Sequence, residues 1–159
     1  MNTRSGFTLI EVLIAIIVLS IGLLGLASLQ ANGLKNNTSA YQRSQATLLA
    51  GEMLDRLRAN HVGRCAGFYD NLLAGAVSDP GCITGGCTPA QMAQYDAFQW
   101  SERVAALLPS GEGSVTGAGR DSIFTIIVMW DDERTGATGT NCSGNPNVDL
   151  TCFTLSTRP

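Results

Sequence analysis

Hydrophobic residues form one nearly unbroken block close to the N-terminus. Residues 7–29 read FTLIEVLIAIIVLSIGLLGLASL, and Glu11 is the single charged residue among them. At about 1.5 Å per residue, a helix made of this block is about 34 Å long, which is enough to cross a bilayer core of roughly 30 Å. We therefore expect residues 7–29 to form a helix that is apolar on every side and suited to a membrane.

The hydrophobic pattern becomes periodic after residue 29. Leu34, Tyr41 and Leu48 are spaced seven residues apart, and Leu54 and Leu57 extend the same stripe. Polar residues between them are expected on a solvated face; these are Lys35, Asn36, Asn37, Gln42, Arg43, Glu52, Arg56 and Arg58. The spacing predicts an amphipathic continuation of the helix over residues 30–59. A coiled coil is the alternative for this repeat, which is short and interrupted.

Residues 60–159 are expected to form a head that begins with an irregular connection. Glycine and proline recur through residues 61–87 and break regular structure there. A helix is predicted over residues 88–108, because Thr88 suits its N-cap, Pro89 its first position and Gln91 a capping box. We place Trp100 in the core. The apolar stripe of this helix comprises Ala93, Ala97, Trp100, Val104 and Leu107.

Short β-favouring segments occupy residues 112–157. They read SVT, SIFTIIVMW and CFTLS, and turns rich in glycine, asparagine and proline separate them. We expect an antiparallel meander whose inner face packs on the second half of the long helix. The middle segment is apolar on both faces, which predicts a central strand. Its two faces carry Phe124, Ile126, Val128 and Trp130 on one side, and Ile123, Ile127 and Met129 on the other.

The pattern as a whole predicts an α+β fold. A long N-terminal helix, with a membrane half and an amphipathic half, is expected to pack on a small antiparallel sheet together with a second, short helix.

Composition and cysteine usage indicate the compartment of the protein and exclude some classes of function. The 159 residues carry a net charge of −3 and no cluster of basic residues, so nucleic-acid binding is not expected. All five cysteines follow the apolar block, and their odd number leaves one thiol unpaired. Their spacing does not complete a zinc site. We therefore expect an oxidising compartment and the disulfides Cys82–Cys87 and Cys142–Cys152, with Cys65 left over.

A secretory signal peptide is the alternative to a retained membrane anchor. A signal peptide has a shorter apolar core and a small-x-small cleavage site, whereas Ala27-Ser28-Leu29 lacks the second small residue. Arg4 and the starting amine precede the block, and such positive charge favours the cytoplasmic side. We expect a single span with a cytoplasmic N-terminus and an exported head, which agrees with the cysteines.

Glu11 is the costly residue of this span. A carboxylate within a membrane helix costs about 2.5–3.5 kcal/mol on insertion scales and usually marks a functional partner. One alternative is that Glu11 lies within a turn of the interface and reaches water. The other is that cleavage after Gly6 gives Phe7 a free α-amine, which pairs with Glu11 of a neighbouring subunit. Such a pair compensates the free-energy cost of burying both charges and fixes the axial shift between adjacent helices.

The N-terminal residues resemble the class III signal of type IV prepilins. The resemblance is carried by a short basic leader (residues 1–6) that ends at Gly6 and is followed by FTLIEVLIA. It implies a type IV pilin-like fold, cleavage after Gly6 and N-methylation of Phe7 by a prepilin peptidase, and assembly of the helices into a filament core. It also implies that Glu11 is the registering carboxylate between subunits.

Four longer segments resemble the PilV family of minor pilins, the type IV pilus modification proteins. They read LSIGLLGLASLQ, NNTSAYQRSQATLLAGEMLDRLRAN, CTPAQMAQYDAFQW and IIVMWDDER. The N-terminal signal alone fits any pilin or secretion pseudopilin, and the four segments together favour the minor pilins.

Three other motifs do not meet the requirements of a binding or catalytic site. The successive acids Asp131, Asp132 and Glu133 point in different directions, unlike the alternating ligands of a calcium loop, so a solvated turn is expected. The stretch GEGSVTGAG has no lysine after its glycines, as a phosphate loop needs. His61 has no nucleophile or orienting acid near it in the sequence. We expect no enzymatic activity, no cofactor and no metal site.

These inferences together predict a minor pilin. It is expected first in the bacterial inner membrane with its head in the periplasm, and then in a type IV pilus at the cell surface. There it supports pilus assembly or initiation, and adhesion or motility. The expected partners are other minor pilins, the major pilin, the prepilin peptidase and the inner-membrane assembly platform. The alternatives are a type II secretion pseudopilin and a membrane-anchored periplasmic enzyme or binding module with an uncut N-terminus.

Overall fold

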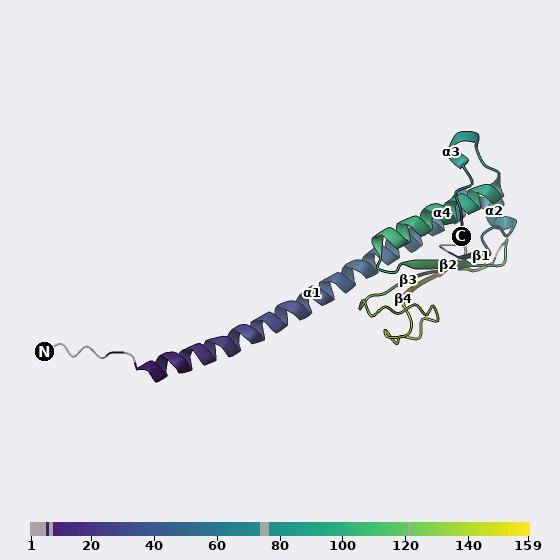
Figure 1. Ribbon diagram of the computed structural model, residues 1–159. Coiled ribbons are helices and arrows are strands. Elements are labelled where there is room, and N and C mark those ends of the chain that lie inside the picture. Colours follow the sequence, from purple (N-terminus) through teal and green to yellow (C-terminus); the bar gives the residue numbers. More distant parts are fainter. Residues whose placement is uncertain (1–5, 7, 74–76, 121) are drawn as a thin grey trace. The chain divides into compact units, whose positions relative to one another are not determined.

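The computed structural model describes residues 6, 8–73, 77–120 and 122–159 (Figure 1). Two compact units, Met1–Ala40 and Tyr41–Pro159, make up the chain. Residues 1–5 of the expected leader and the expected modified residue Phe7 lie outside the described residues.

Helix α1, Leu9–Ala59, contributes to both units. Glu11 lies in its first turn and Arg56 and Arg58 in its last, which is the charge distribution that a helix dipole favours. Every side chain of residues 9–29 is exposed. Among the described helices, α1 is the one long and apolar enough to cross a membrane.

The second unit contains the last part of α1, short helices and a four-stranded sheet (Figure 1). The helices are α2 His61–Cys65, α3 Cys82–Gly85 and α4 Pro89–Leu107, and the strands are β1 Asn71–Leu73, β2 Glu112–Thr116, β3 Phe124–Trp130 and β4 Thr151–Thr157. This arrangement confirms the predicted α+β class. The irregular connection predicted over residues 61–87 is wrong in part, because α2, β1 and α3 lie within it.

The sheet is antiparallel throughout, with the strand order β1-β2-β3-β4. The predicted central strand is β3, which pairs with both β2 and β4 and is buried along most of its length. Strand β1 is only three residues long, too short for an alternating pattern to reveal it. The two edges of the sheet are β1 and β4.

The hydrophobic core lies between the sheet, α1 and α4. The part of it that α1 supplies consists of Ala46, Leu49, Ala50, Met53 and Leu57. The predicted stripe is wrong for Leu34, Tyr41 and Leu48, which are 59–68% exposed. It is right for Leu57, which is fully buried, and for Leu54, which packs against the core. Small alanines on the buried face let other elements approach α1 closely, and their weak hydrophobicity concealed that face in the sequence.

Helix α4 begins with the predicted capping box. The Thr88 hydroxyl accepts a hydrogen bond from the N–H of Gln91 at 3.3 Å, and the Gln91 side chain accepts one from the N–H of Thr88 at 3.1 Å. Pro89 occupies the first turn, where no N–H is needed. The start of the helix is therefore fixed by local sequence alone.

Trp100 ties α4 to the rest of the core, as predicted. Its indole N–H donates to the carbonyl of Leu49 at 2.9 Å, and its side chain is 1% exposed. The ring packs on the backbone of Gly113, where an added Cβ would lie 2.3 Å from a ring carbon. The predicted core residue Leu107 is 41% exposed, and Leu108, just beyond the helix, is buried in its place because the chain turns there.

A buried carboxylate organises the turn after β3. Asp131 accepts hydrogen bonds from the N–H groups of Thr135 at 3.0 Å and Gly136 at 2.8 Å, and it is 6% exposed. Burial opposes ionisation, but the bonds from Gly136 and Thr135 lower the pKa of Asp131. The prediction that this acidic run is a solvated turn is therefore wrong for Asp131, which serves as an acceptor for loop amides.

The loop before β4 is held in a similar way. Asp149 accepts hydrogen bonds from the N–H of Ser143 at 3.2 Å and the N–H of Asn141 at 3.4 Å. Hydrogen bonds from Ser143 lower the pKa of Asp149, and hydrogen bonds from Asn141 lower it further. A disulfide joins Cys142 to Cys152 at the start of β4.

The remaining cysteines lie at the end of α2 and around α3. A second disulfide joins Cys82 to Cys87 around α3, and Cys65 is a free thiol.

Candidate functional site

Gly6 and Glu11 lie at the beginning of the apolar helix. Gly6 precedes α1 and is exposed, with no atom within 4 Å of the place where a Cβ would be added. The N–H of Glu11 donates to the carbonyl of Thr8 at 3.1 Å, so Glu11 already belongs to the first helical turn. Gly6 is thus an exposed residue three positions before the first residue of α1.

Glu11 is the only ionisable side chain between residues 6 and 34, and it lies on an exposed apolar surface. It borders a shallow groove whose other lining residues are Val12, Ala15, Ile16 and Leu19. A carboxylate in such surroundings is stable in lipid only if it meets a cation or a hydrogen-bond donor, or if it reaches water.

The apolar surface around Glu11 extends along the helix. The large apolar side chains from Leu9 to Leu29 are between 48% and 84% exposed. There are fourteen of them, and fully burying an exposed side chain of this size is worth about 1.5–3 kcal/mol, so covering all of them is worth at most about 20–40 kcal/mol. The Ser20 hydroxyl donates to the carbonyl of Ile16 at 2.7 Å and so needs no water. This helix therefore requires lipid or other apolar helices around it.

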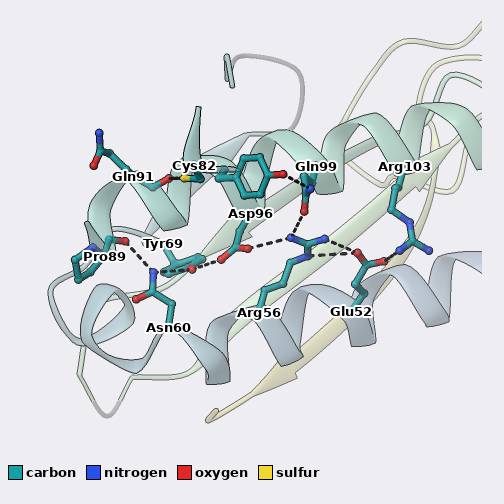
Figure 2. Close-up of polar contacts among 11 residues, drawn as sticks. Glu52, Arg56, Asn60, Tyr69, Cys82, Pro89, Gln91, Asp96, Gln99 and Arg103 are labelled. Carbon is teal, nitrogen blue, oxygen red and sulfur yellow. Dashed lines mark hydrogen bonds and ion pairs between the residues drawn. The ribbon is translucent and has the colours of Figure 1, made fainter. Parts of the chain in front are cut away.

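A half-buried charged network joins α1 to α4 in the head (Figure 2). Arg56 donates to Glu52 at 2.8 Å and to Asp96 at 3.0 Å. It also donates to Gln99 at 3.0 Å, while Arg103 lies 2.9 Å from Glu52. Burial alone would lower the pKa of Arg56, but its bonds to Glu52 and Asp96 raise it. The predicted solvated face is wrong for Glu52 and Arg56, whose side chains are 21% and 20% exposed.

The same network continues to the start of α4 through Tyr69 (Figure 2). The hydroxyl of the fully buried Tyr69 donates a hydrogen bond to the Asp96 carboxylate at 2.5 Å. Asn60 donates to the Tyr69 oxygen at 3.0 Å and to the carbonyl of Pro89 at 2.8 Å. Burial and the bond to Asp96 raise the pKa of Tyr69. Local sequence patterns do not reveal this network, because Arg56 and Asp96 are 40 residues apart in the chain.

His61 has a thiol neighbour, Cys65, four residues further along the chain. The sulfur of Cys65 lies 3.5 Å from Nε2 of His61, one helical turn away on α2. The statement that no nucleophile lies near His61 is therefore wrong. In the part of the chain that the structure describes, no group of three or more His, Cys, Asp and Glu side chains is placed to hold a metal ion.

Comparison with protein families gives two adjacent matches. Residues 1–27 match the prokaryotic N-terminal methylation motif, and residues 28–98 match the family described as type IV pilin Tt1218. Comparisons with curated proteins and with solved structures gave no match. The first match contains Gly6 and Glu11, and the second contains Glu52, Arg56, Tyr69 and Asp96 of the network but not Gln99 or Arg103. The predicted resemblance to type IV pilins is confirmed, whereas the finer resemblance to the PilV family stays a prediction. The N-terminal motif, the family match and the α+β fold all show that this chain is similar to the type IV pilins.

Proposed function

We propose that this chain is a minor pilin that is cut after Gly6 and built into a type IV pilus. The observation that carries the proposal is Glu11, a single charge on an exposed apolar helix that begins three residues after Gly6. The N-terminal methylation motif over residues 1–27 supports processing by a prepilin peptidase. The pilins are structural subunits, and we propose no catalytic role.

Cleavage supplies the cation that Glu11 lacks. Hydrolysis of the Gly6–Phe7 peptide bond leaves an α-amine on Phe7, which the peptidase then methylates. The amine of one subunit pairs with the Glu11 carboxylate of its neighbour when the helices pack side by side. Because each charge offsets the burial cost of the other, only one offset between adjacent helices is favourable.

The proposed topology places the head outside the cytoplasm. Arg4 holds the N-terminus on the cytoplasmic side, and residues 7–29 span the inner membrane. The Cys82–Cys87 and Cys142–Cys152 disulfides support an oxidising compartment, the periplasm, for the head. The assembly platform in the inner membrane then transfers the subunit into a fibre with the major pilin and other minor pilins.

The minor role is inferred from the resemblance of four segments to the PilV family. A subunit of this kind supports initiation of the pilus, and adhesion or motility depends on it indirectly. A type II secretion pseudopilin shares the N-terminal motif and is distinguished by the structure into which the chain is incorporated. A membrane-anchored enzyme or binding module is distinguished by an uncut N-terminus.

The test combines mass spectrometry with a substitution at Glu11. In cells with active prepilin peptidase, we expect a mature chain that begins with N-methylated Phe7. We expect Glu11→Gln to lower incorporation into sheared pili about tenfold or more, because the Phe7 amine is left without a counter-charge. Glu102→Gln, an exposed glutamate on α4, is the control and should assemble like the unmodified chain. A mature chain that keeps Met1 or Asn2 would contradict the proposal.

A further inference from the structure

Both edges of the sheet leave the hydrophobic core partly open. Leu72 of β1, and Phe153 and Leu155 of β4, pack against the core but remain partly exposed. Among the described residues, no backbone hydrogen bond joins β4 to any segment other than β3. Edge strands are usually protected by charge or proline, and β4 contains neither. The edge of β4 is therefore a ready template for another strand.

The strand order determines which strand fits. Each strand is antiparallel to the next, so the two edges of a four-stranded sheet run in opposite directions. Two heads that lie side by side in the same orientation therefore bring β4 of one against β1 of the other as an antiparallel pair. Such a head-to-tail contact repeats from one copy to the next instead of closing as a symmetric pair.

The register of the sheet shows that the two edges match. Leu72 and Leu155 lie in the same row, connected through Val115 and Ile126. Asn71 and Ser156 lie in the adjacent row, and both are exposed. Heads aligned level with each other thus pair leucine with leucine on the core side and polar residues on the outer side.

Charges at the ends of the two strands are complementary. Asp70 directly precedes β1, and its carbonyl accepts the N–H of Gly117 at 3.0 Å. Arg158 directly follows β4 and is exposed. In the register that pairs Leu72 with Leu155, Asp70 of one head lies opposite Thr157 of its neighbour, and the neighbour's Arg158 lies one residue beyond Asp70. The Asp70 carboxylate also accepts the N–H of Gly119 at 2.8 Å, which holds it at this end of the strand.

We propose that β4 of one head pairs with β1 of a second copy of this chain and so extends the sheet from head to head. The contact closes the core at Leu72 and Leu155 and places Asp70 beside Arg158. The inference rests on the proposed function in one respect: the shared membrane holds the copies level with each other and in the same orientation before they enter a fibre. The contact is small by itself and depends on that shared anchoring for its effective concentration.

Cysteine cross-linking tests the register directly. Asn71→Cys and Ser156→Cys are made separately in the full chain with Cys65→Ser, carry different tags and are co-expressed in membranes. Residues opposite each other in antiparallel strands have Cα atoms about 4.5–5.5 Å apart, which suits a disulfide. We expect oxidation to give the mixed 71–156 dimer and neither single-variant dimer. No mixed dimer, a 156–156 dimer, or an adduct of position 156 with a different pilin would overturn the proposal.

A charge reversal provides the matched control. Arg158→Glu in the Ser156→Cys chain should lower the yield of the mixed dimer about two- to fivefold, as for an exposed ion pair. Arg43→Glu, an exposed arginine on α1, should leave the yield unchanged. Equal yields for the two variants count against the predicted Asp70 contact. The outcome is separable from the proposed function: a cut, assembled chain without the mixed dimer overturns only the edge pairing, and an uncut chain that forms it contradicts only the pilus role.

Discussion

Asp96 provides the most direct test of how the head is held together. Its side chain is 9% exposed, and its carboxylate accepts hydrogen bonds from Arg56 at 3.0 Å and from Tyr69 at 2.5 Å. Asp96→Asn keeps the shape of the side chain but retains one acceptor oxygen, so one of these two donors faces an amide NH₂ group. Losing a hydrogen bond to a charged group costs about 1.5–3 kcal/mol. Breaking a fully buried ion pair costs about 3–5 kcal/mol.

The expected cost for Asp96→Asn lies below the second range, because Arg56 is partly exposed and keeps Glu52 as a partner. We expect the free energy of unfolding to fall by about 2–3 kcal/mol. For a domain of this size, that corresponds to a decrease in Tm of about 6–15 °C. Thermal unfolding of the full chain in detergent, followed by near-ultraviolet circular dichroism, measures this change in the head.

Asp55→Asn is the control. Asp55 also pairs with an arginine of α1, Arg58 at 3.4 Å, but its side chain is 78% exposed, so the change should stay within about 0.5 kcal/mol. A double-mutant cycle of Asp96→Asn with Tyr69→Phe should give a coupling energy of about 1 kcal/mol or more. If Asp96→Asn unfolds at the same temperature as Asp55→Asn, the network does not stabilise the head and the argument fails.

Three further predictions concern pH and packing in the head. Burial raises the pKa of Tyr69 above its ordinary 10.0, so the contribution of Tyr69 to stability is complete below pH 10 and declines above it. In alkaline melts, the difference in unfolding free energy between the unmodified chain and Tyr69→Phe should shrink by up to about 1.4 kcal/mol per pH unit. The pKa of Asp131 is lowered from 3.8, so its contribution to stability is present above that pH and is lost on acidification. Asp131→Asn should lower the free energy of unfolding by about 1–2 kcal/mol at neutral pH. Acid titration of the unmodified chain and of Asp131→Asn should show this difference disappearing below about pH 4. Gly113→Ala places a methyl group against the Trp100 ring and should lower the free energy of unfolding by about 1–3 kcal/mol. Gly51→Ala adds a methyl group that meets no atom within 4 Å and should be neutral or stabilising. Equal denaturant midpoints for the two variants would contradict the close contact between Gly113 and Trp100.

The outline of the fold was predictable where the sequence carries a strong local signal. The membrane half of α1 is apolar on every side, so no periodicity had to be resolved. The start of α4 is encoded by Thr88, Pro89 and Gln91, whose roles depend on residues three positions apart. Strand β3 is apolar on both faces, and a strand of this kind is buried in the middle of a sheet. Each of these features depends on neighbours in the chain.

The prediction failed where a distant partner determined the outcome. Tyr41 and Leu48 are spaced as an apolar stripe of α1, yet the buried face is the one with Ala46, Leu49, Ala50, Met53 and Leu57, because the sheet and α4 pack on that side of the helix. Strand β1 is defined by its pairing with β2 and not by its three residues. Asp131 looked like part of a solvated turn, but the backbone after it folds back to donate amides to it.

The sequence by itself determined the N-terminal motif, the apolar helix and its single carboxylate, because these need only the chemistry of consecutive residues. The tertiary structure alone decided which face of α1 is buried, that Arg56, Asp96 and Tyr69 meet, and that β1 and β4 are the open edges. Contacts between residues 40 positions apart depend on how the elements pack, and that packing is selected by the whole chain at once.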